Sequence, residues 1–167
     1  GTGLTFLLAT QLFLAEAPPN ARLQWISTDQ YPLNRADLVK LHQQIELPAA
    51  AARLATQMHA VWPLCVSGCH RRLFAAGRVC LDLHWDDAAS RFANLNGHIN
   101  AWCLDGFSPD RNPAMWTPHL FQAVARLSGP DTTLATFTTA RSVRDGLHAC
   151  GFALQKHPGF GGKRERL

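Results

Sequence analysis

Hydrophobic and polar positions follow helical spacing in some stretches of the chain and strand-like spacing in others. Residues 4–16 are mostly apolar, and two prolines follow at positions 18 and 19. Because proline cannot continue a helix, we expect a mostly buried helix over 4–16 that ends there. The next apolar run, Leu23–Thr28, contains Trp, Ile and Thr and stops at Asp29, which predicts a short strand.

The same patterns predict the remaining elements. We expect helices from Asn34 to about Gln44, from Pro48 to about Ala60, over 87–95, over 117–127, and from a capping Ser142 to Cys150, with Gly151 ending the last one. We expect a hairpin of strands 70–74 and 78–85, and strands over 101–104, 133–138, 152–157 and 164–167, the last two around a Gly-rich turn at 158–162. Strands that alternate with helices predict an α/β fold with a mainly parallel sheet.

One carboxylate stands at the end of a predicted strand and at the start of a tight turn. Residues 101–104 are apolar, and Asp105 follows them directly, before Gly106, Phe107 and a proline. In open α/β sheets, ligands bind outside the carboxyl ends of the strands. Asp105 is therefore a candidate site residue. The alternative is a carboxylate that only caps the loop through backbone N–H groups.

The segment Gly1-Thr2-Gly3 leads straight into the first helix at Leu4. Glycine lets a ligand approach the backbone closely, and the first turn of a helix offers N–H groups that have no partner within the helix. A dinucleotide site needs a third glycine, whereas Phe6 stands in its place. The pattern disfavours NAD and FAD and suits S-adenosylmethionine, which has no pyrophosphate. A plain helix-entry turn explains a lone Gly-x-Gly equally well.

Two more acidic residues lie at predicted strand ends. Asp29 can accept hydrogen bonds from both hydroxyls of a ribose, or it can cap its own loop. Asp87 can accept from an adenine amino group, or it can be the N-cap of the next helix. Each feature alone is weak. The glycine segment, these two acids and Asp105 nevertheless follow one another at junctions that lead into helices or loops, as in a nucleoside-binding site.

Composition narrows the class of protein. The 167 residues, 47% of them hydrophobic, suit one domain over 1–167 with a substantial core. The net charge of +4 and the thirteen arginines against three lysines are compatible with nucleic acid, because arginine binds phosphate in a bidentate manner and stacks on bases. The clearest basic groups are Arg71-Arg72 and the segment 163–166.

The cysteines and the apolar runs indicate in which cellular compartment the protein is expected. Cys80 and Cys103 sit in apolar runs, so we expect buried, reduced thiols in a cytoplasmic protein. Cys65 and Cys69 have near-ligand spacing, but no second Cys/His pair in the sequence answers them, so we expect no metal site. The apolar run 4–15 is too short to span a bilayer and follows no positive charge, so we expect neither a membrane segment nor a signal peptide.

Seven stretches of the chain, taken in order, resemble one known family. They are residues 1–7, 31–38, 68–71, 102–109, 112–117, 133–138 and 159–165. The chain resembles the methyltransferase domain of the MnmC family, bifunctional proteins that complete 5-methylaminomethyl-2-thiouridine at the tRNA wobble position. The resemblance implies a Rossmann-like, S-adenosylmethionine-dependent methyltransferase sheet and N-methylation of the 5-aminomethyl group on the wobble uridine.

The resemblance also implies roles for individual residues. Those expected to bind S-adenosylmethionine are Gly1, Thr2, Gly3, Leu4, Asp29, Asp87, Asp105 and Phe107. Asp105 would also hold the substrate amine and take its proton as a general base. Those expected to contact tRNA phosphates are Lys163, Arg164 and Arg166. Trp116 or Phe160 could stack on an extruded base, although a core position suits Trp116 better.

The likeness begins inside the glycine-rich loop of the family. We therefore expect an N-terminally truncated domain that lacks its first strand and binds S-adenosylmethionine weakly. The FAD-dependent oxidoreductase domain that family members often carry lies beyond this sequence, so we expect FAD only in a longer protein. We expect a cytoplasmic monomer with tRNA as its partner. Two alternatives stay open: a methyltransferase for a small molecule or a protein, and a non-catalytic fragment.

Overall fold

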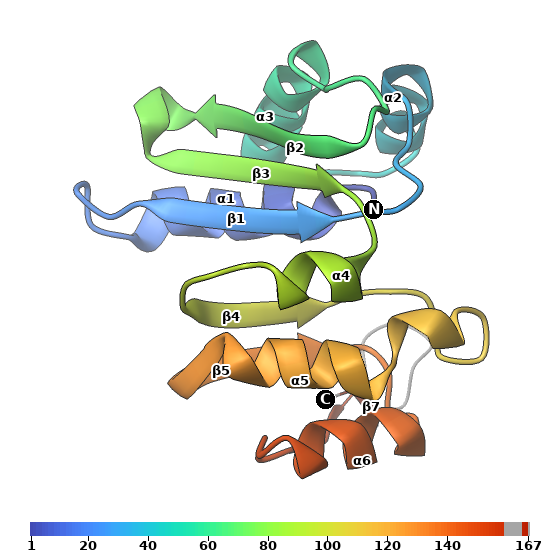
Figure 1. The fold of residues 1–167 in the computed structure, drawn as a ribbon. Helices are drawn as coiled ribbons and strands as arrows, with labels where there is room; N and C mark the ends of the chain where they lie inside the picture. The colour runs from blue at the N-terminus through green and yellow to red at the C-terminus, as the bar shows by residue number, and fades with distance from the viewer. Residues whose placement is uncertain (159–164, 167) are drawn as a thin grey trace. The chain divides into compact units, whose positions relative to one another are not determined.

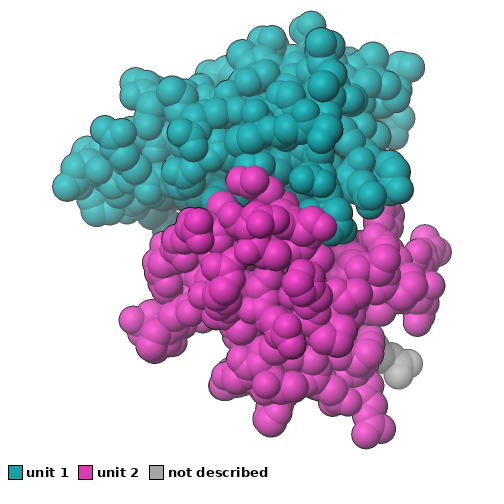
Figure 2. Space-filling view, in the orientation of Figure 1, with its two compact units in different colours: residues 1–87 teal, residues 88–167 magenta. Residues whose placement is uncertain are grey.

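The computed structural model describes residues 1–158 and, by their backbone alone, residues 165 and 166. The chain has an α/β fold and divides into two compact units, residues 1–87 and 88–167 (Figure 2). Each unit has its own strands and its own apolar core. Within the described residues, no helix is both long enough and apolar enough to cross a membrane.

Unit 1 consists of a three-stranded sheet and three helices (Figure 1). The strands are β1 (Leu23–Thr28), β2 (Gly68–Phe74) and β3 (Val79–Trp85), in the order β1-β3-β2. The helices are α1 (Leu4–Glu16), α2 (Arg35–Gln43) and α3 (Ala49–Ala60). β1 runs parallel to β3 and β2 runs antiparallel to it, so the predicted hairpin is confirmed and the sheet is mixed.

Side chains of β3 alternate between two environments, as the pleat of a strand requires. The odd-numbered residues from Val79 to Trp85 are buried in the apolar core that α1, α2 and α3 share with the sheet. The even-numbered residues Cys80, Asp82 and His84 lie on the other face. All three helices therefore cover the same face of the sheet.

Local sequence signals set the helix boundaries of unit 1 correctly. Gly3 precedes α1 with φ +74°, and α1 ends at Glu16, before the two prolines. The side chain of Asn34 accepts a hydrogen bond from the Asp37 N–H at 2.9 Å, so it caps α2 as predicted. α1 is buried along one stripe only, because Leu8 and Leu12 are exposed. The prediction of a mostly buried helix was therefore wrong.

Unit 2 contains a parallel pair of strands, β4 (Ile99–Leu104) and β5 (Ser128–Thr136). Its helices are α4 (Ala88–Ala93), α5 (Pro118–Arg126) and α6 (Arg141–Ala149), with a short 3-10 turn, η2 (Pro113–Met115). β6 (His157–Pro158) and β7 (Glu165–Arg166) form a short antiparallel pair. Residues from β4, α4, α5 and α6 share one apolar core.

Three predictions about the second half of the chain were wrong. Ser142 does not cap α6; the N-cap is Ala140, and Thr138 Oγ1 accepts its N–H at 3.3 Å, so the chain turns two residues earlier. Residues 152–156 are not in a strand, because the Phe152 N–H donates to the Leu147 carbonyl at 3.2 Å and closes the end of α6. β5 spans Ser128–Thr136 rather than the predicted 133–138, and its register on β4 shifts between Ile99 and Ala101.

The expectation of buried thiols was also wrong. Cys103 is exposed and Cys80 is only half-buried. Strand alternation explains the difference, since the neighbours Trp102 and Leu104 point into the core of unit 2 and Cys103 points to the opposite face. All five cysteines are free, and the described residues contain no cluster of three or more His, Cys, Asp or Glu side chains that could hold a metal ion.

Candidate functional site

The glycine segment and Asp29 meet at one edge of the sheet in unit 1. The N-terminal ammonium of Gly1 forms an ion pair with Asp29 Oδ2, and Asp29 Oδ1 accepts the N–H of Tyr31 at 2.9 Å. The Asp29 N–H also extends the β1–β3 ladder by donating to the His84 carbonyl at 2.9 Å. This acid is therefore fixed at the carboxyl end of β1, beside the start of α1 (Figure 1).

Gly3 has a conformational reason to be glycine. Its φ of +74° lies in the left-handed region. Glycine adopts this conformation without steric cost, Asn and Asp adopt it occasionally, and other residues rarely do. A Cβ at this position would lie 3.1 Å from Met58 Cε, a tight contact with a residue that is 1% exposed. The backbone of the glycine segment therefore lies directly against α3.

His42 is hydrogen-bonded to the carbonyl of Thr2, and His59 is hydrogen-bonded to His42. His42 Nε2 lies 2.8 Å from the Thr2 carbonyl oxygen, and His42 Nδ1 lies 2.8 Å from His59 Nε2. A carbonyl oxygen only accepts, so His42 Nε2 must carry the hydrogen, and a neutral His42 then accepts at Nδ1 from the His59 Nε2–H. The chain His59 to His42 to Thr2 ties the glycine segment to the last turns of α2 and α3.

This chain of hydrogen bonds is satisfied when both rings are neutral. Burial, followed by the neighbouring His42 and Arg35, lowers the pKa of His59. His42 is 6% exposed. Sequence reasoning gave none of the histidines a role in the site, because His42 and His59 are 17 positions apart and only the packing of α2 against α3 brings them together. Their position in the last turn of each helix was the one local signal.

The carboxyl end of β3 lies at the same edge as Asp29. The pairing runs parallel from Leu23 opposite Val79 to Thr28 opposite His84, so Asp86 and Asp87 follow β3 where Asp29 follows β1. Asp87 donates its N–H to Asp86 Oδ1 at 2.8 Å. Unit 1 therefore gathers the predicted cofactor residues Gly1, Thr2, Gly3, Leu4, Asp29 and Asp87 at one edge of its sheet.

In unit 2, the turn after β4 holds Asp105 and Phe107. A Cβ on Gly106 would overlap the end of the Met115 side chain, so Met115 packs directly against this turn and would have to move for any larger residue. The Trp116 indole N–H donates to the Phe107 carbonyl at 2.8 Å, and Trp116 is buried in the core, as predicted. The side chain of Phe107 is 71% exposed. Met115 of η2 and the following Trp116 thus contact the backbone of the turn, while the side chains of Asp105 and Phe107 are exposed.

Cys103 lies on β4, two residues before Asp105. Desolvation, and then the charge of Asp105, raises the pKa of Cys103, although the residue as a whole is exposed. Asp105 follows the carboxyl end of β4, where Leu104 pairs with Thr136 of the parallel strand β5. Asp105 therefore stands at the edge where ligands bind in α/β sheets. That it joins the residues of unit 1 in one site stays a prediction.

The residues present fit S-adenosylmethionine. A carboxylate at a strand end, Asp29, can accept ribose hydroxyls, and it lies beside a helix start whose first helical hydrogen bond runs from the Leu7 N–H to the Gly3 carbonyl at 2.9 Å. The start of a helix presents backbone N–H groups to one side, which suits the polar groups of a nucleoside and an amino acid.

The structure describes the side chains of only one of the two predicted basic groups, Arg71-Arg72. Arg71 donates from Nε and from an Nη to the two oxygens of Asp82, at 2.7 and 2.8 Å, and Arg72 donates to backbone carbonyls. The Arg71 guanidinium holds the pKa of Asp82 below its ordinary value. Both arginines therefore bond within unit 1, and their role as a nucleic-acid patch stays a prediction. Lys163 and Arg164 lie outside the described residues, and Arg166 is described only as part of β7.

A family model described as S-adenosyl-L-methionine-dependent methyltransferase matches residues 49–167. The chain belongs to this family. The family's cofactor is the one that the glycine segment and the acids predicted, and the prediction of a methyltransferase is confirmed.

The chain is also similar to one curated protein and to one solved structure. The tRNA 5-methylaminomethyl-2-thiouridine biosynthesis bifunctional protein MnmC of Aeromonas hydrophila subsp. hydrophila is 49% identical over 175 residues, which cover 100% of this chain and 26% of that protein. The chain thus spans about a quarter of the length of this curated relative. The crystal structure of MNMC2 from Aquifex aeolicus has a TM-score of 0.75 at 22% identity and covers 99% of this chain and 49% of that one. This likeness confirms the predicted Rossmann-like methyltransferase fold.

Proposed function

We propose that this chain transfers a methyl group from S-adenosylmethionine to the amine of 5-aminomethyl-uridine at the wobble position of tRNA, giving 5-methylaminomethyl-uridine. The observation that carries the proposal is the 49% identity, over the whole chain, to a protein named for the biosynthesis of tRNA 5-methylaminomethyl-2-thiouridine. We take tRNA as the partner and the cytoplasm, where mature tRNA is found, as the location.

The reaction requires a neutral amine beside the methyl donor. S-adenosylmethionine supplies, when bound, a methyl group on a positively charged sulfur. A primary ammonium has no lone pair with which to attack, and a carboxylate or carbonyl beside the methyl group can hold the amine and take its proton. Asp105 has the right chemistry for this role, and the turn pinned by Met115 and Trp116 holds it in place.

The remaining residues divide into two roles. Gly1, Thr2, Gly3 and Leu4 would approach the cofactor with their backbone, and Asp29 and Asp87 would accept its ribose hydroxyls and adenine amino group. Phe107, with its exposed ring, would form an apolar wall beside Asp105. The hydrogen bonds from His59 to His42 and from His42 to the Thr2 carbonyl hold the glycine segment in place.

The test is methyl transfer from labelled S-adenosylmethionine to a tRNA that carries 5-aminomethyl-uridine. The matched substrate is the same tRNA with unmodified uridine at the wobble position. We expect label only in the first tRNA, and we expect Asp110→Asn, which removes a charge from the same loop as Asp105, to keep the activity. Equal labelling of both tRNAs, or labelling of neither, would reject the proposed substrate.

A further inference from the structure

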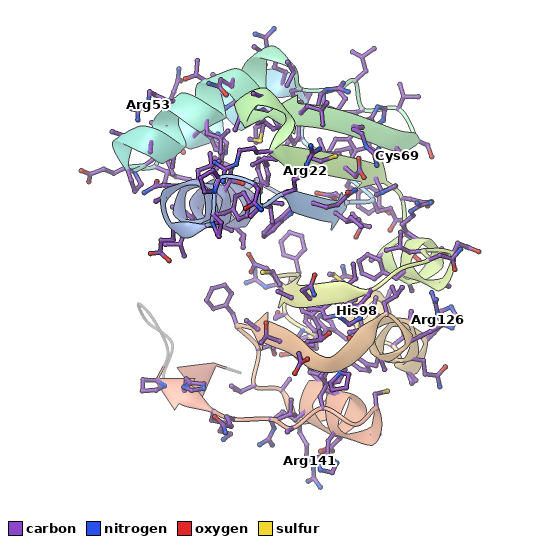
Figure 3. The ribbon with its side chains drawn as sticks, turned by 90° about the vertical axis from the view of Figure 1, so that its left-hand side faces the viewer. Arg22, Arg53, Cys69, His98, Arg126 and Arg141 are labelled. Carbon is purple, nitrogen blue, oxygen red and sulfur yellow. The ribbon has the colours of Figure 1, made fainter. Side chains whose placement is uncertain are left out.

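A basic cleft lies on α6, within unit 2. It has a volume of about 530 Å³ and is lined by Arg141, Arg144, Asp145, His148, Leu154 and Lys156. Three of these side chains are permanently cationic and only one is acidic. Figure 3 shows Arg141 on the outer side of this helix. The sequence reasoning placed the basic contact surface at 163–166, whereas the cations of this cleft come from α6 and from Lys156.

The geometry of α6 explains how the cleft is built. Val143 and Leu147 are fully buried in the core of unit 2. Positions 141, 144, 145 and 148 are spaced i, i+3, i+4 and i+7, so they share the opposite face of the helix. Lys156 comes from the extended segment that follows the helix. The apolar stripe thus fixes the direction in which the basic face points.

Several features of this basic face cost free energy when no ligand is bound. Arg141 and Arg144 stand in the first turn of α6, where the helix dipole repels cations. No side chain within the described residues caps this end of the helix. The Nε–H of Arg144 is buried, and among the described residues it has no hydrogen-bond partner. Asp145 relieves only part of the charge, since its pair with Arg141, at 3.4 Å, is between two exposed side chains.

A bound anion would offset the positive charge that these side chains gather at the start of α6. We propose that this cleft binds the phosphodiester backbone of the tRNA substrate, with the Arg144 guanidinium donating to phosphate oxygens and Arg141 and Lys156 on either side. The inference rests on the proposed function for the identity of the RNA. Arginine suits this role because its planar fork donates to two phosphate oxygens at once. Phosphate contacts of this kind set the position and affinity of the tRNA and leave the choice of base to the site near Asp105.

The test is binding of fluorescently labelled tRNA, followed by anisotropy over a range of salt concentrations. The variant Arg141→Ala/Arg144→Ala/Lys156→Ala removes the cleft cations. The matched control Arg22→Ala/Lys40→Ala/Arg53→Ala removes three exposed cations of unit 1, two of which are labelled in Figure 3. Each lost phosphate contact lowers the slope of log K against log salt by roughly 0.7 to 0.9. We therefore expect a slope smaller by about 2 to 3 for the cleft variant, affinity weaker by at least about tenfold, and little change in the control.

Further arms of the experiment separate the possible explanations. Arg144→Lys keeps the charge and loses the fork, so we expect intermediate affinity at unchanged melting temperature. Inorganic phosphate at millimolar concentration should not compete, whereas unlabelled tRNA should; strong competition by free phosphate would reject the polymer as the ligand. Equal losses in the cleft variant and the control would reject the cleft. If tRNA binds through the cleft but is never methylated, the proposed function fails and this inference stands.

Discussion

Replacing Gly3 by alanine tests whether the glycine segment is held as the structure describes. At φ +74° an alanine pays about 1–2 kcal/mol for the left-handed conformation. Its Cβ would also lie 3.1 Å from Met58 Cε, so the end of that side chain must move by a few tenths of an ångström. In a chain of this length each kcal/mol lowers the melting temperature by roughly 2–4 °C. We expect Gly3→Ala to melt about 2–8 °C lower.

Gly77→Ala is the matched control for this substitution. Gly77 has φ +85° in the β2–β3 turn, and an alanine there would meet nothing within 4 Å among the described residues. Gly77→Ala should therefore lose only the cost of the left-handed conformation and Gly3→Ala at least as much, while only Gly3→Ala should weaken the binding of S-adenosylmethionine. Melting curves and calorimetric titration with the cofactor measure the two effects. Wild-type cofactor affinity in Gly3→Ala, or equal loss of affinity in both variants, would refute the assignment of the glycine segment to the cofactor site.

Three further predictions follow from other parts of the structure. Asp105→Asn should lower turnover by about 10²- to 10⁴-fold with little change in the affinity for S-adenosylmethionine, because the amide cannot take the amine proton; single-turnover rates measure this, and wild-type rates would make Asp105 structural. The pKa of His59 is lowered in the folded chain. The contribution of this histidine to the free energy of unfolding is therefore complete above about pH 6.5 and is lost as the pH falls through the lowered pKa. The urea midpoint should fall less steeply between about pH 7.5 and 5 in His59→Asn than in the parent chain. Gly146→Ala would normally stabilise a helix by about 1 kcal/mol, but the new Cβ would overlap the Phe121 ring, so we expect a net loss of about 1–3 kcal/mol in melting experiments, with exposed Ser142→Ala in the same helix as a neutral comparison.

The first half of the fold was predictable because local signals there agree with one another. The prolines after α1 allow only one helix end, and Asn34 has both the sequence position and the side chain of an N-cap. The hairpin of β2 and β3 followed from two β-rich runs around a small-residue turn, although Ala75 and Ala76 both adopt positive φ there. In each case a short window of sequence contained the deciding interaction.

The errors lie where distant contacts decide the structure. The Phe152 N–H completes the end of α6 by donating to Leu147, and this takes residues 152–156 out of the strand that their composition favours. The extension of β5 to Ser128 depends on Thr132, whose hydroxyl donates to the Ile99 carbonyl of the neighbouring strand at 2.7 Å. Neither interaction leaves a signal in the segment that it controls.

The candidate site shows the same division. Gly3, Asp29, Asp87 and Asp105 could be selected from sequence because each stands at an end of a helix or strand, and the structure places the first three at one edge of unit 1. His42 could not be selected, since its role depends on the packing of α2 and α3 beneath the Thr2 carbonyl. The pairing of Arg71 with Asp82 likewise needed the register of β2 on β3.

The most direct test of the account is to identify the methylated nucleoside itself. The chain is incubated with S-adenosylmethionine and with tRNA that carries 5-aminomethyl-uridine at the wobble position, and the digested nucleosides are analysed by mass spectrometry. The account predicts conversion of that nucleoside to 5-methylaminomethyl-uridine, with loss of conversion in Asp105→Asn and retention in Asp110→Asn. Methylation of another nucleoside, or full conversion by the Asp105→Asn variant, would contradict it.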